Sequence, residues 1–353
     1  MAKDNSTSPR KLDHIRICLE EQVEAGNPGF ADVHLVHCAL PGMNLDRIDT
    51  SVRFLGYRLR SPLFIAAMTG GHPSTTGINR RLAAAAEHFG IGMGVGSQRA
   101  ALENPDLEGS FTVVREEAPT AFLCANLGAV QLRDHGIEWA DRAVEMIGAQ
   151  ALCVHLNFLQ EAIQPEGDHD ATGCLEAIRD LCSDFRVPVI AKETGAGISR
   201  ETADLLWGAG VAAIDVGGAG GTSWALVESL RARDEAAAGR GRRFAAWGIP
   251  TVASLCEVAG TGGPVIATGG IRSGMDMAKA VALGADLCGM ALPLLAPAVE
   301  GEEQLCSAIT GLQEDLQTAM FLTGSRSVAE LHRARTWITG STRQMTKNKK
   351  KGD

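Results

Sequence analysis

Short apolar runs recur along the chain, and each is followed by a stretch with the composition of a helix. The runs end in glycine or a polar residue and occupy residues 64–67, 92–95, 122–125, 152–154, 189–191, 213–216, 265–267 and 287–290. Strands that are apolar on both faces and alternate with helices are typical of a buried parallel sheet. Eight of them predict a closed (β/α)8 TIM barrel in preference to an open doubly wound sheet. No GxGxxG follows the first run, which further disfavours the open, dinucleotide-binding alternative.

One such barrel accounts for nearly all of the 353 residues, 45% of which are hydrophobic. We therefore expect an N-terminal cap segment at residues 1–53, the barrel at 54–340, and a basic, disordered tail at 341–353.

Composition narrows the class of protein. A net charge of −9 argues against a general nucleic-acid binder, so an anionic ligand would need a local basic pocket. The nine cysteines are scattered and never form CxxC, which indicates reduced thiols and a cytoplasmic location. Neither a signal peptide nor a membrane-spanning apolar stretch is recognisable.

Polar residues follow the first five strands, at 68–71, 97–99, 126, 155–161 and 192–193. The carboxyl ends of barrel strands converge on one face, where barrel enzymes place their chemistry. After the sixth strand, the long segment that begins with 220–222 and includes the arginine-rich stretch 231–243 is either a lid or an exposed insertion.

The sequence GGIRSG at 269–274 follows the seventh strand and precedes a helix. Its glycines allow close approach of a ligand, while helix N–H groups and Arg272 supply donors and positive charge for a phosphate. Ala291 and Leu292, after the eighth strand, would line the other side. The alternative is a glycine-rich turn without a ligand.

Lys192 ends an otherwise apolar strand and should project into the barrel mouth. An amine there could stabilise negative charge on a reduced flavin, form a Schiff base, or pair with Glu193 or Asp215. Taken alone, Lys192 does not decide among these.

The stretch HLNFLQE at 155–161 is the most informative. Alternation at a strand end places His155 and Asn157 on one side, followed by Gln160 and Glu161. Imidazole and amide groups can donate to a diphosphate, and a carboxylate can hold a Mg²⁺ ion that the diphosphate also ligates. Four polar groups within one segment at the catalytic face favour a functional site.

Three charged segments are ambiguous by pattern alone. Residues 10–14, RKLDH, are typical of a charged helix start, whereas Glu166 and Asp168 could join a metal site or form a turn. The basic run 347–351 is typical of a solvated tail.

Together the motifs resemble a known family. RKLDHI, AAMTGG, GVGSQRAAL, ANLGA, HLNFLQEAIQPEGD, KETGAGIS, GAGGTSW and GGIRSG occur in family order from Arg10 to about Leu331. They resemble the FMN-dependent type 2 isopentenyl diphosphate isomerases. The HLN motif and GGIRSG are highly specific together, although GGIRxG alone is shared among FMN and phosphate barrels.

The resemblance implies site residues one by one. Contacts to FMN are implied for Ala67, Met68, Thr69, Ser97, Asn126, Lys192, Thr222, Gly270, Ile271, Arg272, Ala291 and Leu292. Contacts to the substrate are implied for Arg10, Lys11, Ser97, Gln98, Arg99, His155, Asn157 and Gln160, the last also as a catalytic residue. Glu161 is implied to bind Mg²⁺. The chain departs from the family at Gly217, where a serine is usual, so a hydroxyl contact to the flavin is expected to be absent.

The implied reaction moves a double bond, with one proton added and another removed, which requires a dry site with an acid and a base. The resemblance assigns that role to reduced FMN. NADPH is the implied reductant, and it would bind transiently, since no dinucleotide fingerprint is present. The resemblance also implies a homo-oligomer, a tetramer or an octamer, with no nucleic-acid or membrane partner.

Two other functions stay open. A 2-hydroxy-acid oxidase is a second FMN barrel, but no His-Gly-Gly sequence follows the sixth strand to serve as its base. A flavin-binding paralogue without catalysis, acting as a sensor, is disfavoured by the intact Arg10-Lys11 and Gln160-Glu161 pairs.

Overall fold

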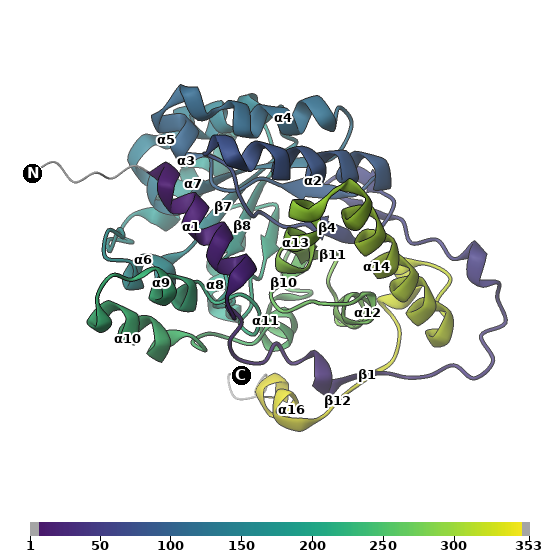
Figure 1. The fold of residues 1–353 in the computed structure, drawn as a ribbon. Helices are drawn as coiled ribbons and strands as arrows, with labels where there is room; N and C mark the ends of the chain where they lie inside the picture. Colours follow the sequence, from purple (N-terminus) through teal and green to yellow (C-terminus); the bar gives the residue numbers. More distant parts are fainter. Residues whose placement is uncertain (1–6, 348–353) are drawn as a thin grey trace, which may run out of the picture.

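The computed structural model describes residues 7–347, which are built around a closed barrel of eight parallel strands (Figure 1). The strands follow the chain around the barrel, and the last closes onto the first. They are β4 (Leu63–Ile65), β5 (Gly92–Gly94), β6 (Leu123–Gly128), β7 (Ala151–Leu156), β8 (Val189–Glu193), β9 (Ala213–Asp215), β10 (Val265–Thr268) and β11 (Leu287–Met290). Each coincides with one of the eight apolar runs, so the predicted (β/α)8 barrel is confirmed.

Helices that follow the strands form the outer layer. They are α2 (Thr76–Phe89), α3 (Arg99–Glu103), α4 (Gly109–Glu117), α5 (Ala129–Ile147), α6 (Phe158–Ile163), α7 (Cys174–Asp184), α8 (Arg200–Gly208), α9 (Trp224–Arg231), α10 (Glu235–Phe244), α11 (Thr251–Val258), α12 (Gly274–Ala282), α13 (Leu292–Glu300), α14 (Glu302–Thr323) and α15 (Val328–Leu331). Among residues 7–347, no helix has both the length and the apolar character that crossing a bilayer requires.

The half of the barrel interior near the amino-terminal ends of the strands is apolar. Side chains near the starts of the strands, including Phe64, Ile190 and Leu287, form a separate buried cluster there. A short hairpin of β2 (Val52–Phe54) and β3 (Tyr57–Leu59) contributes Phe54 and Leu59 to the same cluster. The hairpin therefore closes the amino-terminal end of the barrel, and the barrel opens into a cavity at the opposite end.

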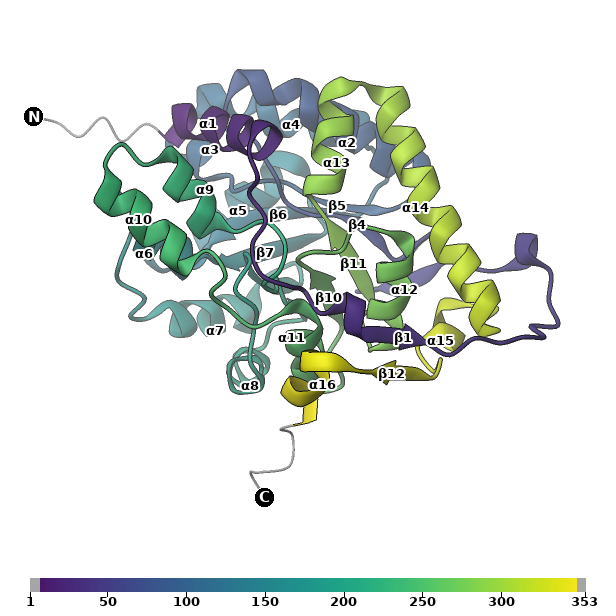
Figure 2. The same cartoon turned by 60° about the horizontal axis from the view of Figure 1, so that its bottom comes forward.

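The N-terminal segment crosses that opposite end. Helix α1 (Thr7–Glu20) lies in front of the barrel strands in Figure 1 and contacts α9, α13 and α3. Further along, β1 (Val33–Leu35) pairs antiparallel with β12 (Thr336–Ile338), so two segments from opposite halves of the sequence lie side by side (Figure 2).

The expectation of a disordered tail from residue 341 is corrected for residues 341–347, which belong to α16 (Gly340–Lys347). The helix is anchored because the carboxylate of Asp32 accepts a hydrogen bond from the backbone N–H of Thr342 (3.1 Å), and the Thr342 side chain is buried. The rest of the predicted tail lies outside the described residues.

Candidate active site

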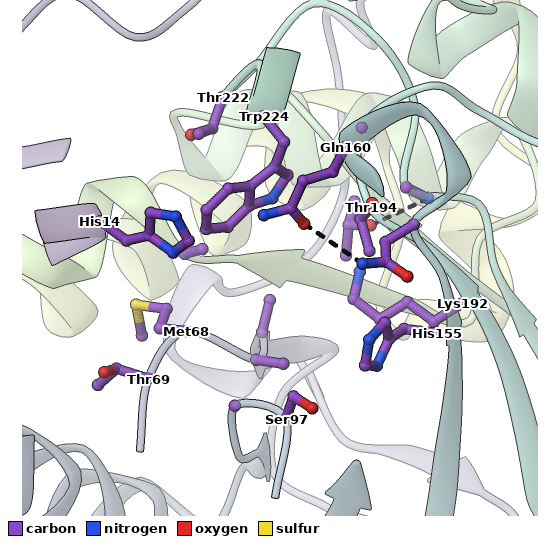
Figure 3. A pocket seen from close by; sticks show the side chains of 18 of the residues that line it. His14, Met68, Thr69, Ser97, His155, Gln160, Lys192, Thr194, Thr222 and Trp224 are labelled. Carbon is purple, nitrogen blue, oxygen red and sulfur yellow. Dashed lines mark hydrogen bonds between the residues drawn. The ribbon is translucent and has the colours of Figure 1, made fainter. Parts of the chain in front are cut away.

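A cavity opens at the carboxyl ends of the barrel strands, under α1 and α9. Figure 3 shows Met68, Thr69 and Ser97 on one side of it and His155 and Lys192 on another. Trp224 and Gln160 lie across from Ser97 in the same view. The cavity thus gathers side chains from segments far apart in the sequence.

Strand alternation explains why the cavity floor is polar. Successive inward-facing residues of a strand are two positions apart. Cys124, Cys153 and Ile190 belong to the apolar cluster near the amino-terminal ends of the strands. The inward-facing residues two positions later in β6, β7 and β8 therefore lie at the barrel mouth. These are Asn126, His155 and Lys192, and all three line the cavity.

The cavity contains features that fit a flavin. The hydroxyl oxygen of Thr69 is buried and has no hydrogen-bond partner among the described residues, although buried polar atoms are normally paired. A bound ligand with polar ring edges would supply that partner. Thr69, Asn126 and Lys192 would face such a ring.

A phosphate cradle lies at one edge of the cavity. Gly270 has φ of +69°, and a Cβ on Gly221 would collide with the backbone nitrogen of Gly270, so the loops after β9 and β10 touch where glycine permits it. Arg272 lines the same edge and forms an ion pair with Glu24. A phosphate bound here would share the guanidinium with that carboxylate.

Lys192 forms an ion pair within the site. Its ammonium lies 3.0 Å from Oδ2 of the fully buried Asp215, whose other oxygen accepts a hydrogen bond from the hydroxyl of Thr268. The ion-pair alternative is therefore realised with Asp215, while Lys192 also lines the cavity. The pair keeps an ammonium at the barrel mouth without an uncompensated buried charge.

Cationic side chains gather on the other side of the cavity. Arg10 and Lys11 of α1 lie with Arg99 of α3 along its wall. Burial, followed by the positive charges of Arg10 and Arg99, lowers the pKa of Lys11 to about 8. The Nε atom of Arg10 is buried and has no partner among the described residues. Arg99 pairs with Glu103 (2.7 Å), so the group leaves the Nε donor of Arg10 available to an anion.

His155 lies near Lys11 and Lys192 as a neutral group. Burial, with the nearby charges of Lys11 and Lys192, lowers its pKa to about 3. Its Nδ1 atom is 2.8 Å from Oδ1 of Asn126.

Glu161 is held at the edge of the cavity by two donors. Its carboxylate accepts from the amide of Asn157 (2.8 Å) and from the backbone N–H of Asp168 (2.8 Å). Glu166 instead pairs with Arg231. The PEGD segment thus forms a turn that positions Glu161. Across residues 7–347 no three His, Cys, Asp or Glu side chains converge on one metal position, so a cation at Glu161 would need ligands from its substrate or water.

A buried carboxylate orients Gln160, and sequence reasoning missed it. Glu228 of α9 accepts from the amide of Gln160 (2.8 Å), lies 3.0 Å from the imidazole of His14, and pairs with Arg231 (2.7 Å). Burial alone would raise the pKa of Glu228, but the hydrogen bond from His14 and the nearby charges lower it to about 2. A helical spacing of four from Trp224, which lines the cavity, is the signal that could have found Glu228.

The segment expected to be either a lid or an insertion is helical. Helix α9 forms part of the cavity wall through Trp224, and α10 packs against α9 with most of its arginines exposed. The first part of the segment therefore lines the cavity, and the second part is an exposed insertion.

The cavity brings together the residues expected to bind FMN, substrate and Mg²⁺, with the exception of Gln98 and Ile271. Gln98 is fully buried beneath the wall, where its side chain donates to the carbonyl of Ala143 (2.9 Å) and accepts from the backbone N–H of Asn126 (2.9 Å). It therefore supports Asn126 from behind.

The backbone geometry explains why glycine occupies position 217. Its φ is +45°, and a Cβ there would collide with the carbonyl oxygen of Glu193. This backbone path admits glycine only, so the usual serine hydroxyl has no counterpart at this position.

Comparison with known proteins defines the class. The family model described as FMN-dependent dehydrogenase matches residues 138–338, and the site has the orphaned hydroxyl, ammonium and glycine cradle that suit FMN. The class is that of FMN-dependent barrel proteins.

Relatives define the family within that class. The chain is 64% identical over 348 residues to an isopentenyl-diphosphate delta-isomerase of Methanoregula boonei, which covers 97% of each chain. Proteins of the same name from Archaeoglobus fulgidus (55% identity, 95% of this chain and 97% of the relative) and Methanosarcina mazei (54%, 96% and 94%) are also similar. The chain belongs to the family of FMN-dependent isopentenyl-diphosphate delta-isomerases.

Solved structures share the fold. A mandelate oxidase variant with an FMN monooxide adduct aligns with a TM-score of 0.62 at 19% identity, covering 93% of this chain and 92% of its own. A flavocytochrome b2 variant with pyruvate bound gives 0.64 at 20% identity, covering 86% and 75%. At such identities the likeness shows the barrel fold alone.

Proposed function

We propose that the protein interconverts isopentenyl diphosphate and dimethylallyl diphosphate in isoprenoid biosynthesis, with reduced FMN as acid-base catalyst and Mg²⁺ holding the diphosphate. One observation carries the proposal: a single cavity has flavin-type features on one side and, on the other, a group of cations that includes the unpaired, buried Nε of Arg10. The names of the relatives support the same reaction.

The cation side would hold the diphosphate. Arg10, Lys11 and Arg99 offer charge-assisted hydrogen bonds, which are about twice as strong as neutral ones. Glu161, fixed by Asn157 and the backbone of Asp168, would hold Mg²⁺ against the diphosphate oxygens.

The opposite side would hold the cofactor. Thr69, Asn126 and Lys192 would contact the ring, while Gly270 and Arg272 would contact the phosphate. The reaction needs an acid and a base close to the carbons of an apolar alkene. Reduced FMN, when bound, would supply both.

The chain's own residues would position the alkene and exclude water. Trp224 and Met68 contribute apolar surface beside the expected ring. Gln160, oriented by Glu228, would act at the reacting end as the catalytic side chain. His155 is neutral and Lys192 is paired, so neither offers a free acid at ordinary pH.

The proposal includes NADPH as a transient reductant that is not consumed in each turnover. It also includes a cytoplasmic homo-oligomer, a tetramer or an octamer, without nucleic-acid or membrane partners. A 2-hydroxy-acid oxidase is disfavoured because the loop 216–223 after β9 contains no histidine.

The test is an anaerobic assay with FMN, Mg²⁺ and a reductant, started separately from each diphosphate. Formation of the other diphosphate from both directions supports the proposal. A flavin-loaded protein that isomerises neither would contradict it and favour a non-catalytic paralogue.

A further inference from the structure

Gln131 lines the cavity, although no motif pointed to it. It lies in the first turn of α5, directly after β6, and is half-buried. Its amide has no hydrogen-bond partner among residues 7–347. The amides of Gln98 and Gln160, by contrast, are engaged by protein groups. The Gln131 amide therefore faces the cavity with its donors and acceptor free for a ligand.

Gly128 makes room for this amide. Its backbone angles, φ −76° and ψ 150°, suit any residue, so conformation does not require glycine here. Space does, because a Cβ would collide with Oε1 of Gln131 and would lie 3.1 Å from Nε2 of His155. The Gln131 amide, with its oxygen toward Gly128, therefore lies on the same side of Gly128 as the outer nitrogen of His155.

The hydrogen bonds of Asn126 fix what that outer nitrogen can do. The Nδ2 group of Asn126 donates to the carbonyl of Val95 (2.9 Å), which leaves Oδ1 as the acceptor facing His155. Nδ1 of His155 must then carry the hydrogen. In a neutral imidazole Nε2 is therefore a lone pair, which cannot donate to an anionic oxygen. An N–H contact to an anion at this place would therefore come from a neighbouring side chain and not from His155.

We infer that Gln131 is a further substrate-binding residue, whose amide N–H donates to the diphosphate beside His155. The inference rests on the proposed function for the identity of the anion. Together with Arg10, Lys11 and Arg99, Gln131 would complete the donor set from the β6 side of the cavity.

The test replaces Gln131 by methionine, which keeps the length and most of the volume of the side chain but removes the amide. Gln22→Met is the matched control, since Gln22 is exposed and lies outside the cavity. Three quantities are measured: kcat and KM for isopentenyl diphosphate, the inhibition constant of inorganic pyrophosphate, and the dissociation constant of FMN.

Loss of a hydrogen bond to a charged group should raise both KM and the pyrophosphate constant by about 10- to 100-fold in Gln131→Met. The FMN constant and kcat should not change, and Gln22→Met should match the wild type. Unchanged KM and pyrophosphate constants, a loss confined to kcat, or an equal weakening of FMN would each overturn the inference. If the wild type binds pyrophosphate but does not isomerise, the proposed function fails, while the pyrophosphate constants still decide the role of Gln131.

Discussion

The side-chain amide of Gln160 donates to Oε1 of Glu228, and His14 approaches the same oxygen from α1. One buried carboxylate thus fixes a side chain of α6 while joining α1 to α9 over the cavity. The orientation of Gln160 depends on a residue that is not expected to touch substrate or cofactor.

Glu228→Gln should separate this positioning role from binding. The substitution keeps the shape but places an amide opposite Arg231 and Gln160, so the Gln160 amide loses its preferred orientation. We expect kcat to fall by about 10- to 100-fold, because small misplacements of a positioned group slow a reaction by amounts of this order. FMN affinity should stay at the wild-type value in a flavin titration, and an unchanged kcat would show that Gln160 needs no such support.

Arg272→Ala tests the phosphate cradle. A charge-assisted phosphate contact is worth about 1.5–3 kcal/mol, so FMN should bind roughly 10- to 100-fold more weakly in a fluorescence titration of the apoprotein. Riboflavin, which lacks the phosphate, serves as the control ligand and should bind equally to both proteins. Equal losses for FMN and riboflavin would place Arg272 away from the phosphate.

Glu161→Gln tests the metal site. Glutamine keeps the size and shape of the glutamate side chain but lacks the negative charge that attracts a hard cation. We expect a higher Mg²⁺ concentration for half-maximal activity with an unchanged flavin spectrum. Identical Mg²⁺ dependence in the two proteins would remove Glu161 from the metal site.

The pKa of Lys11, lowered to about 8 by burial and by Arg10 and Arg99, gives the site a predicted pH dependence. A bound diphosphate would raise that pKa, so binding favours the protonated amine. The contribution of Lys11 to pyrophosphate affinity should then be constant well below pH 8 and be lost as the pH rises above it. Lys11→Arg, which stays charged, should remove this loss in binding titrations. The same loss in both proteins would exclude Lys11 as its cause.

The barrel could be predicted from sequence because its signal is local. Each strand is a short apolar run, and strand alternation alone brings Asn126, His155 and Lys192 to the mouth. GGIRSG and HLNFLQE, the segments proposed to hold the cofactor and the diphosphate, could be recognised for the same reason, because each is continuous and lies at a strand end.

Long-range contacts were out of reach. Glu24 meets Arg272, and His14 meets Glu228, across more than two hundred residues, and no periodicity encodes such pairs. The motif predicted that Gln98 contacts the substrate, but its side chain lies beneath Asn126, where two hydrogen bonds to other protein groups hold it. Residues 341–347 read as a polar tail because their anchor, Asp32, lies at the other end of the chain.

The central claim is that reduced FMN exchanges protons with the substrate and transfers no net electrons. The most direct test reduces the flavin-loaded protein once, anaerobically, and then supplies excess isopentenyl diphosphate in D₂O with Mg²⁺. The account predicts many turnovers from that single reduction, with deuterium in the dimethylallyl product and no further consumption of reductant. One NADPH oxidised for each product molecule would contradict it and identify a reductase.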